Sequence, residues 1–157
     1  MKLTANITLD ELTKSQVAER KGINNNPSPE QIENLKALAV NILQPVRSHF
    51  DKPLIISSGI RTSQLCLEIG SSVNSQHTAS DEAAAADFEI PGVDNKELGT
   101  WIRNNLEVDQ GILEFYKDGE PSSGWIHVSY SRNHNRQQWL RAMREECKVI
   151  YKPWLGE

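Results

Sequence analysis

Apolar residues recur at helical spacing through the segment that follows Ser28 and Pro29. Ser28 suits an N-cap, Pro29 suits the first helical position, and Gln31 suits the reciprocal partner of a capping box. The pattern predicts one amphipathic helix from there to Phe50, bent near Pro45 because proline cannot continue the helical hydrogen bonds. We expect the apolar stripe of this helix to lie in the protein core.

Short apolar runs bounded by turn residues predict four strands. The runs are residues 53–57, 86–90, 111–116 and 125–130. The last two are separated by a polar segment that contains Asp118, Gly119 and Pro121. Because such residues favour turns, we expect these two strands to form a hairpin.

Besides a short helix expected around residues 62–69 and ended by Gly70, two further helices complete the predicted fold. One begins at Asp94, with Glu97 as its capping-box partner. The other begins near Asn135 and carries three large apolar residues, Trp139, Leu140 and Met143. We therefore expect an α+β fold, in which helices pack on one small antiparallel sheet. The 157 residues suit a single domain with a single core, spanning residues 1–157.

Composition narrows the class of function. The chain is 38% hydrophobic and 24% charged, as soluble globular proteins are. Its net charge of −4 argues against nucleic-acid binding, and no apolar run is long enough to span a membrane. No stretch typical of a signal peptide follows Met1, so we expect the protein to be made in the cytoplasm. We also expect a monomer. Cys66 and Cys147 lack a CxxC context, and we expect two reduced, mostly buried thiols.

The four histidines are candidate metal ligands. His49 ends an amphipathic helix, where we expect a structural role, and His134 lies in a polar loop, where we expect a surface position. His77 lies in a polar loop before a strand, and His127 shares one face of a strand with Ser129. A catalytic zinc site needs three protein ligands and one open position. A single histidine is more often structural than a ligand, so the surrounding motifs decide.

Four short segments follow one another in an informative order. They are residues 57–62 (SSGIRT), 75–77 (SQH), 85–90 (AADFEI) and 124–129 (GWIHVS). No single segment is specific, but together they resemble the successive motifs of the zinc D-alanyl-D-alanine carboxypeptidases. That family also includes phage endolysins that cut the L-alanyl-D-glutamate bond, and its fold is shared with the hedgehog signalling domain. Residues 8–15 and 26–47 resemble its phage and prophage branch.

The resemblance implies a role for five side chains. His77 and Asp87 match the first two zinc ligands of the family, and His127 matches the third ligand on the late strand. Arg61 matches the arginine that binds substrate carbonyl or carboxylate oxygens and balances a developing oxyanion. Ser75 matches a serine that lies near the substrate. The expected cofactor is therefore Zn2+, held by His77, Asp87 and His127.

The spacing of the first two ligands departs from the family pattern. The family usually places them seven positions apart, whereas His77 and Asp87 are ten apart and the family glycine between them has no clear equivalent. We interpret the difference as a three-residue insertion in a loop, which costs little closure entropy. Asp81 or Glu82 is the alternative carboxylate ligand, and loss of the metal is a third reading. Asp87 is preferred because a strand holds a ligand rigidly.

The general base also departs from the common pattern. Many family members carry a glutamate three residues before the last histidine, where this chain has Gly124. Glu114, on the partner strand of the hairpin, resembles the glutamate that other branches carry there, and we expect it to face His127 across the sheet. Glu120, in the turn, is the second candidate base. Either glutamate could instead be an ordinary surface residue.

The resemblance therefore implies a zinc-dependent peptidase that hydrolyses peptide bonds beside D-amino acids in peptidoglycan stem peptides. Glu114 would act as general base and then as general acid, and Arg61 would orient the substrate. The lack of an export signal favours a phage or prophage endolysin that accumulates in the host cytoplasm and reaches the wall with help, causing lysis. The alternatives are a non-catalytic zinc-containing binding module and a phage structural protein with the same fold.

Overall fold

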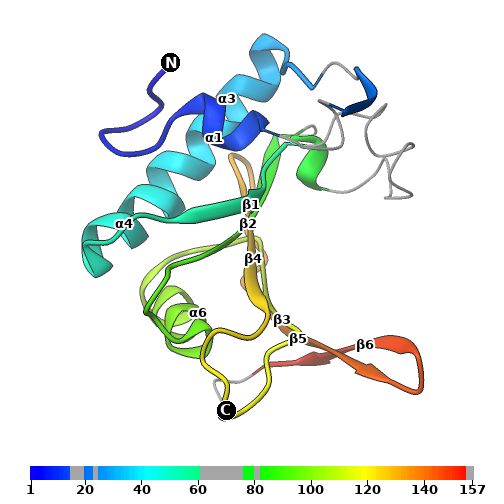
Figure 1. Cartoon of the computed structure of the whole chain (residues 1–157). Coiled ribbons are helices and arrows are strands. Elements are labelled where there is room, and N and C mark those ends of the chain that lie inside the picture. Colours follow the sequence, from blue (N-terminus) through cyan, green and yellow to red (C-terminus); the bar gives the residue numbers. More distant parts are fainter. Residues whose placement is uncertain (15–19, 23–24, 61–75, 80–81, 155–157) are drawn as a thin grey trace.

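The computed structural model describes residues 1–14, 20–22, 25–60, 76–79 and 82–154. Its sheet has six strands in the order β1-β2-β4-β3-β5-β6 (Figure 1). The strands are β1 (Ile55–Ser58), β2 (Ala83–Glu89), β3 (Gln110–Glu114), β4 (Trp125–Ser131), β5 (Gln138–Glu145) and β6 (Lys148–Pro153). The predicted α+β class is confirmed. The sheet is mixed, however, because β3 and β5 run parallel while every other neighbouring pair is antiparallel.

The four strands predicted from apolar runs all form, with shifted ends. The largest shift is in β2, which begins at Ala83 and not at residue 86. Its alanines are small enough to be buried in the middle of the sheet, and Ala84 and Ala86 are fully buried. β2 pairs with β4 along its length, from Ala83 opposite Ser131 to Phe88 opposite Ile126. This pairing places the two strands that carry Asp87 and His127 at the centre of the molecule.

The predicted C-terminal helix is wrong, because its apolar residues lie on strand β5. Trp139 lies on the neighbouring Gly111, whose missing side chain leaves room for the indole ring. Strand β5 then turns into β6 through Glu146 and Cys147, which both have positive φ (48° and 65°). A tight hairpin turn needs such angles, and Asn-Gly usually supplies them. Glu-Cys gives no such signal, so the sequence pattern suggested a helix.

The helices are short and follow the capping residues closely. They are α1 (Leu9–Thr13), α3 (Pro29–Leu38), α4 (Gln44–Phe50) and α6 (Asn95–Asn105), with a 3-10 turn, η2, at Gln76–Thr78. The predicted capping box of Ser28 and Gln31 is present. At α6, Asp94 caps the helix by accepting the N–H of Lys96, and the predicted box with Glu97 does not form.

The predicted bend of the long helix is a π-helical stretch, η1, at Ala39–Leu43. It ends at Leu43, two residues before Pro45, which occupies the first turn of α4. Proline has no N–H and its ring clashes with the carbonyl four residues back, and a wide turn before it relieves both problems. The chain therefore continues from α3 into α4 with both helices still facing the core.

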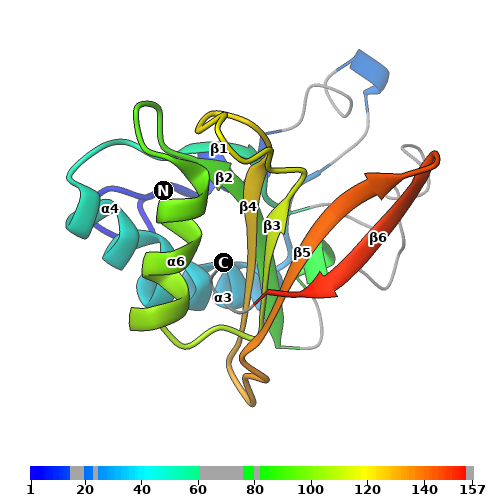
Figure 2. The ribbon, with the colours of Figure 1, turned by 90° about the horizontal axis from the view of Figure 1, so that it is seen from below.

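The helices pack on one face of the sheet, as Figure 2 shows from below. Helix α3 contacts β2 and β4, and α6 contacts β3 and β4. Phe88, Ile126 and Val128 point into this layer and are fully buried. Because side chains alternate along a strand, the neighbouring Asp87 and His127 point to the opposite face. Among the described residues, no helix is long and apolar enough to cross a membrane.

Candidate metal centre and the adjoining pocket

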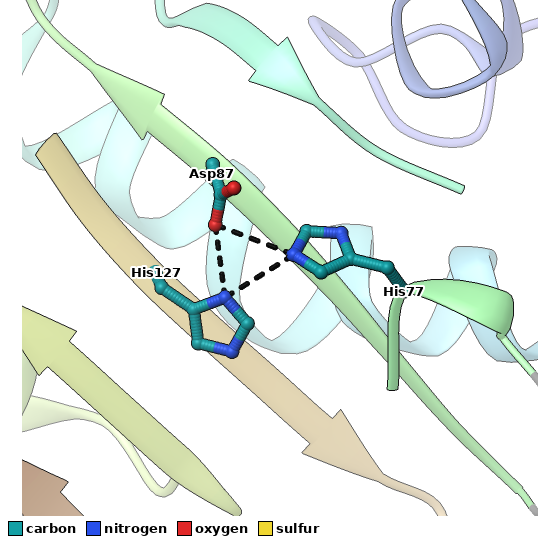
Figure 3. A group of neighbouring side chains, drawn as sticks. All are labelled: His77, Asp87 and His127. Atoms are coloured by element: carbon teal, nitrogen blue, oxygen red, sulfur yellow. Dashed lines mark hydrogen bonds and ion pairs between the residues drawn. The ribbon is translucent and has the colours of Figure 1, made fainter. Parts of the chain in front are cut away.

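Three buried side chains meet on the face of the sheet opposite α3 and α6 (Figure 3). The Nε2 atom of His77 lies 3.4 Å from Oδ1 of Asp87 and 3.3 Å from Nδ1 of His127. The Nδ1 atom of His127 lies 2.8 Å from the same oxygen of Asp87. Two nitrogen atoms and one oxygen atom thus converge on one point.

These separations match a tetrahedral zinc site. Bonds of about 2.0–2.2 Å from zinc to nitrogen or oxygen, at tetrahedral angles, place the ligand atoms about 3.3–3.5 Å apart. Two of the distances, 3.3 and 3.4 Å, lie in this range, and the third, 2.8 Å, is a hydrogen bond that a bound metal would replace with a small adjustment. Imidazole and carboxylate are also ligand types that zinc takes in catalytic sites. The residues present therefore fit Zn2+.

The paired strands β2 and β4 hold two of the candidate ligands in register. Asp87 and His127 are direct cross-strand partners, which brings their side chains together on one face. His77 comes from η2, the 3-10 turn that contacts β2. The insertion between His77 and Asp87 therefore leaves the two side chains in contact. Of the alternative carboxylates, Glu82 is exposed at the start of β2, and Asp81 lies outside the described residues.

The main chain of Gly59 orients the His77 ring. Nδ1 of His77 donates to the Gly59 carbonyl at 2.8 Å, which leaves Nε2 facing Asp87 and His127. Gly59 in turn lies against α1, where a Cβ atom would overlap the carbonyl of Leu12. The N–H of Ile60 donates to that carbonyl at 2.7 Å. The N-terminal segment thus fixes the carbonyl that orients a candidate zinc ligand.

Electrostatics favour an ionised Asp87. Burial raises the pKa of its carboxyl group, but hydrogen bonds and charge interactions with His127 and His77 outweigh burial and hold the pKa well below its usual range. The carboxylate is therefore charged at neutral pH. A metal ligand must be deprotonated, so this state is the one that binding requires.

The three side chains line an open pocket of about 510 Å³. Strand β3 crosses this pocket with Gln110, Ile112 and Glu114 on the same face. Ile112 is the direct partner of His127, so the metal cluster lies level with the middle of the three. The remaining lining residues are Gln76, Trp125, Arg136 and Tyr151. The pocket therefore extends to both sides of the cluster along the strand direction.

Glu114 lines the pocket, but the expected pairing with His127 is wrong by two residues. Ile112 lies opposite His127, and Glu114 lies opposite Trp125. Glu114 is thus a diagonal neighbour of His127 on the same face, at a distance that long side chains span. Glu120 is exposed in the turn and does not line this pocket. Of the two candidate bases, only Glu114 is near the candidate metal centre.

Gly124 explains why the common position for the base is empty in this chain. Its φ is +64°, a conformation that side-chain-bearing residues rarely adopt. A Cβ atom there would overlap the carbonyl oxygen of Glu114 and lie 2.8 Å from the carbonyl carbon of Phe115. Asn95 of α6 donates to the Gly124 carbonyl at 3.2 Å and to the Ser123 carbonyl at 3.0 Å, which holds the turn in place. A glutamate cannot occupy position 124 in this backbone.

A second polar group at the pocket, formed by Gln76, Asp109 and Arg136, was not predicted. Arg136 donates from Nε and Nη2 to the two carboxylate oxygens of Asp109, at 3.0 Å each. Gln76, next to His77 in the chain, donates to the same carboxylate. Burial raises the pKa of Asp109, but the hydrogen bonds from Arg136 and Gln76 outweigh burial and lower it. The polar residues around Arg136 are the feature of the sequence that could have indicated this group. The incorrectly predicted helix, which begins near Asn135, hid that feature.

The other sequence predictions have mixed outcomes. Arg61 and Ser75, the predicted substrate-binding residues, lie outside the described residues, as do Cys66 and the short helix expected around residues 62–69. Their roles stay predictions. His49, for which a structural role is expected, is exposed and stacks on the indole of Trp101, with 4.2 Å between ring centroids. Cys147 is exposed, and the expectation of a buried thiol there is wrong.

Comparison with known proteins places the chain in a family. A search of curated proteins finds no match. A family model described as Peptidase M15 matches residues 5–129, which is most of the chain. The matched range contains His77, Asp87 and His127, together with Glu114. The chain therefore belongs to the M15 peptidases, the zinc D-alanyl-D-alanine carboxypeptidase family that its motifs resemble.

Proposed function

We propose that this protein is a zinc-dependent peptidase that hydrolyses peptide bonds in peptidoglycan stem peptides, and that it acts as a phage or prophage endolysin. One observation carries the proposal. Three side chains with the donor atoms and spacing of a zinc site line an open pocket that also contains a carboxylate, Glu114. Membership of the M15 family supports both the metal and the substrate class.

The residues that would hold the metal are His77, Asp87 and His127. A zinc ion held there would make water more acidic and would polarise a substrate carbonyl group. Glu114 would act as general base and then as general acid, taking a proton from water and returning it to the nitrogen of the leaving amine. Its place on the same face as His127, one cross-strand pair along, suits this transfer. Ile112, opposite His127, and Trp125, opposite Glu114, line the same pocket.

A non-catalytic zinc-binding module is the second candidate. Gly124 favours it, because the position that often carries the catalytic glutamate in the family cannot carry a side chain here. Glu114 favours the peptidase, because it supplies a carboxylate to the same pocket from the neighbouring strand. A phage structural protein with this fold would need neither carboxylate nor open pocket. The geometry therefore supports the peptidase best.

The test is hydrolysis of purified peptidoglycan by the zinc-loaded protein. New amino groups are counted with and without a chelator, and mass spectrometry of the released fragments identifies the bond that is cleaved. We expect amino groups to appear only when zinc is present, with one zinc per chain. One zinc per chain without hydrolysis would favour the binding module. Absence of zinc binding would refute the metal centre itself.

A further inference from the structure

The Arg136–Asp109 pair leaves one edge of the Arg136 guanidinium open. A guanidinium group has five N–H donors in a fixed plane. Asp109 takes Nε–H and one N–H of Nη2, the two donors of one edge. The adjacent edge, with one N–H of Nη1 and the other N–H of Nη2, presents two parallel donors. That fork is the geometry that binds a carboxylate through two hydrogen bonds.

Burial shows which side of the pair faces the pocket. The side chain of Asp109 is 7% exposed, whereas that of Arg136 is 50% exposed. Arg136 lines the pocket of the candidate metal centre, together with Gln76 and Gln110. The buried carboxylate of Asp109 is therefore turned away from the pocket, whereas the half-exposed side chain of Arg136 lines it.

The surrounding contacts fix Asp109, and Asp109 fixes Arg136. Besides the two guanidinium bonds, Asp109 accepts the main-chain N–H of Arg136 at 3.1 Å and the side-chain amide of Gln76. A guanidinium group that two hydrogen bonds already hold loses little conformational freedom when a ligand binds. Ordering of the side chain therefore subtracts little from the binding free energy of the ligand. Hydrogen bonds thus hold Arg136 in position before a ligand binds, as the Gly59 carbonyl holds the candidate metal ligand His77.

The position of Arg136 along the pocket sets a direction for the substrate. Gln110, Ile112 and Glu114 lie on one face of β3, and Ile112 marks the level of His127. Residues two apart on a strand are separated by about 7 Å. Arg136 and Gln110 thus form one end of the pocket, and Glu114 with Trp125 and Tyr151 forms the other. A peptide that lies extended along β3, with the bond to be cleaved at the metal centre, would therefore place the residue about two positions from that bond at the Arg136 end of the pocket.

We propose that Arg136 is a substrate-binding residue that receives a carboxylate of the stem peptide on the guanidinium edge that Asp109 leaves open. The proposal rests on the proposed function, because it takes the stem peptide as the substrate. That peptide carries carboxylates of two kinds, at its C-terminus and on an internal D-glutamyl residue. Either would supply the planar, charged group that the open edge fits, and the experiment separates them.

The test compares binding of three synthetic stem peptides to the zinc-loaded protein. One has both carboxylates free, one has a C-terminal carboxamide, and one has the internal D-glutamyl carboxylate amidated. Dissociation constants are measured by calorimetry with Glu114→Gln present throughout to suppress turnover, and KM and kcat are measured with Glu114 intact. The variants are Arg136→Gln, Arg136→Lys and a matched control, Arg47→Gln. Arg47 is also ion-paired, with Asp51 at 3.6 Å, but it lies on α4 outside the pocket.

We expect amidation of one of the two carboxylates to weaken binding to the otherwise unsubstituted protein by about 10- to 100-fold, as loss of a charge-assisted bidentate contact does. Arg136→Gln should weaken binding of the free peptide by a similar factor and abolish the effect of amidation. KM should rise more than kcat falls. Arg136→Lys, which keeps the charge but not the fork, should restore part of the discrimination, and Arg47→Gln should retain all of it.

Two results would overturn the proposal. In one, amidation of neither carboxylate weakens binding. In the other, Arg136→Gln weakens binding of all three peptides by the same factor, as a purely structural arginine would. Failure of the proposed function is distinct, because it would appear as absence of hydrolysis by the unsubstituted protein. Selective binding of the free carboxylate through Arg136 without hydrolysis would support the proposal and reject the peptidase.

Discussion

Gly124 lies directly against the main chain of Glu114, so closely that a Cβ atom on Gly124 would overlap the Glu114 carbonyl oxygen. Position 124 is where many family members carry the catalytic glutamate, and Glu114 is the candidate base on the neighbouring strand. Because the overlap is with the main chain, it rules out a side chain at position 124 whatever residue stands at position 114. In this backbone a carboxylate for the pocket must therefore come from another position, and Glu114 on β3 supplies one.

Substitution of Gly124 should be far more destabilising than substitution of Gly119 in the same turn. Gly119→Ala places a side chain at φ +88° with no atom within 4 Å, and should cost about 1–2 kcal/mol. Gly124→Ala adds overlap with main-chain atoms to the same conformational strain, and should cost about 3 kcal/mol or more. Urea unfolding of both variants measures the difference. Equal costs would contradict the close approach of Gly124 to Glu114.

Replacement of Glu114 should separate catalysis from metal binding. Glu114→Gln keeps the shape of the side chain but cannot accept a proton, so kcat should fall by about 10²- to 10⁴-fold. Zinc content should stay at that of the unsubstituted protein, because Glu114 is not among the three clustered ligand residues. Glu120→Gln, in the exposed turn, is the control and should keep full activity. A fully active Glu114→Gln variant would remove Glu114 from the mechanism.

Replacement of Asp87 should test which carboxylate completes the metal centre. Asp87→Asn is nearly isosteric, but a neutral amide is a poor zinc ligand, so zinc affinity should fall by at least about 10-fold. Glu82→Gln removes the alternative carboxylate and should leave zinc affinity unchanged, because Glu82 is exposed at the far end of β2. Metal analysis and competition with a chelator measure both. Loss of zinc from the Glu82 variant alone would reverse the assignment.

The ion pair of Asp109 should stabilise the protein at neutral pH and not in acid. Its pKa is lowered in the folded protein, because the hydrogen bonds from Arg136 and Gln76 outweigh burial. A lowered pKa contributes stability above the unfolded value of about 3.9, and this contribution is lost as the pH falls through the folded value. Asp109→Asn should therefore cost about 1–2 kcal/mol at pH 7, allowing for solvent screening at the half-exposed Arg136.

The pH dependence is checked by urea unfolding of the metal-free protein, with and without Asp109→Asn, from pH 7 downward. The difference in the free energy of unfolding should be constant near neutrality and should shrink below about pH 4. A difference that grows in acid would mean that the pKa of Asp109 is raised and not lowered. Metal-free protein is used so that protonation of His77 and His127 does not release zinc during the titration.

Sequence patterns located the candidate ligands well because each one stands in a local motif on or beside a strand. The motifs predict His77, Asp87 and His127 as candidate ligands, and the structure brings these three side chains together. The register of Glu114 could not be predicted to the residue. It depends on a long turn that contains Phe115 at φ +54° and Gly124 at φ +64°, and such a conformation leaves no simple pattern of residues.

The group of Gln76, Asp109 and Arg136 at the other end of the pocket could not be predicted from the sequence for a different reason. Asp109 and Arg136 are 27 positions apart and come from a strand entrance and a loop. Neither stands in a motif, so only the folded chain brings them together. The incorrect prediction of a C-terminal helix also contributed. That prediction placed Trp139 and Leu140 on one apolar stripe of a helix, whereas on β5 the two side chains alternate between the faces of the sheet. A parallel neighbour for β3 was therefore missing from the predicted sheet.

The metal centre also joins distant parts of the chain. His127 is 40 positions from Asp87 and 50 from His77, and the His77 ring is held by a carbonyl that packs on the N-terminal helix α1. A bound zinc ion therefore acts as a cross-link that closes long loops, and its binding energy opposes unfolding of the whole domain. Zinc supply should consequently set how long the protein survives proteases, because a chain that loses its metal opens more often and is cut sooner.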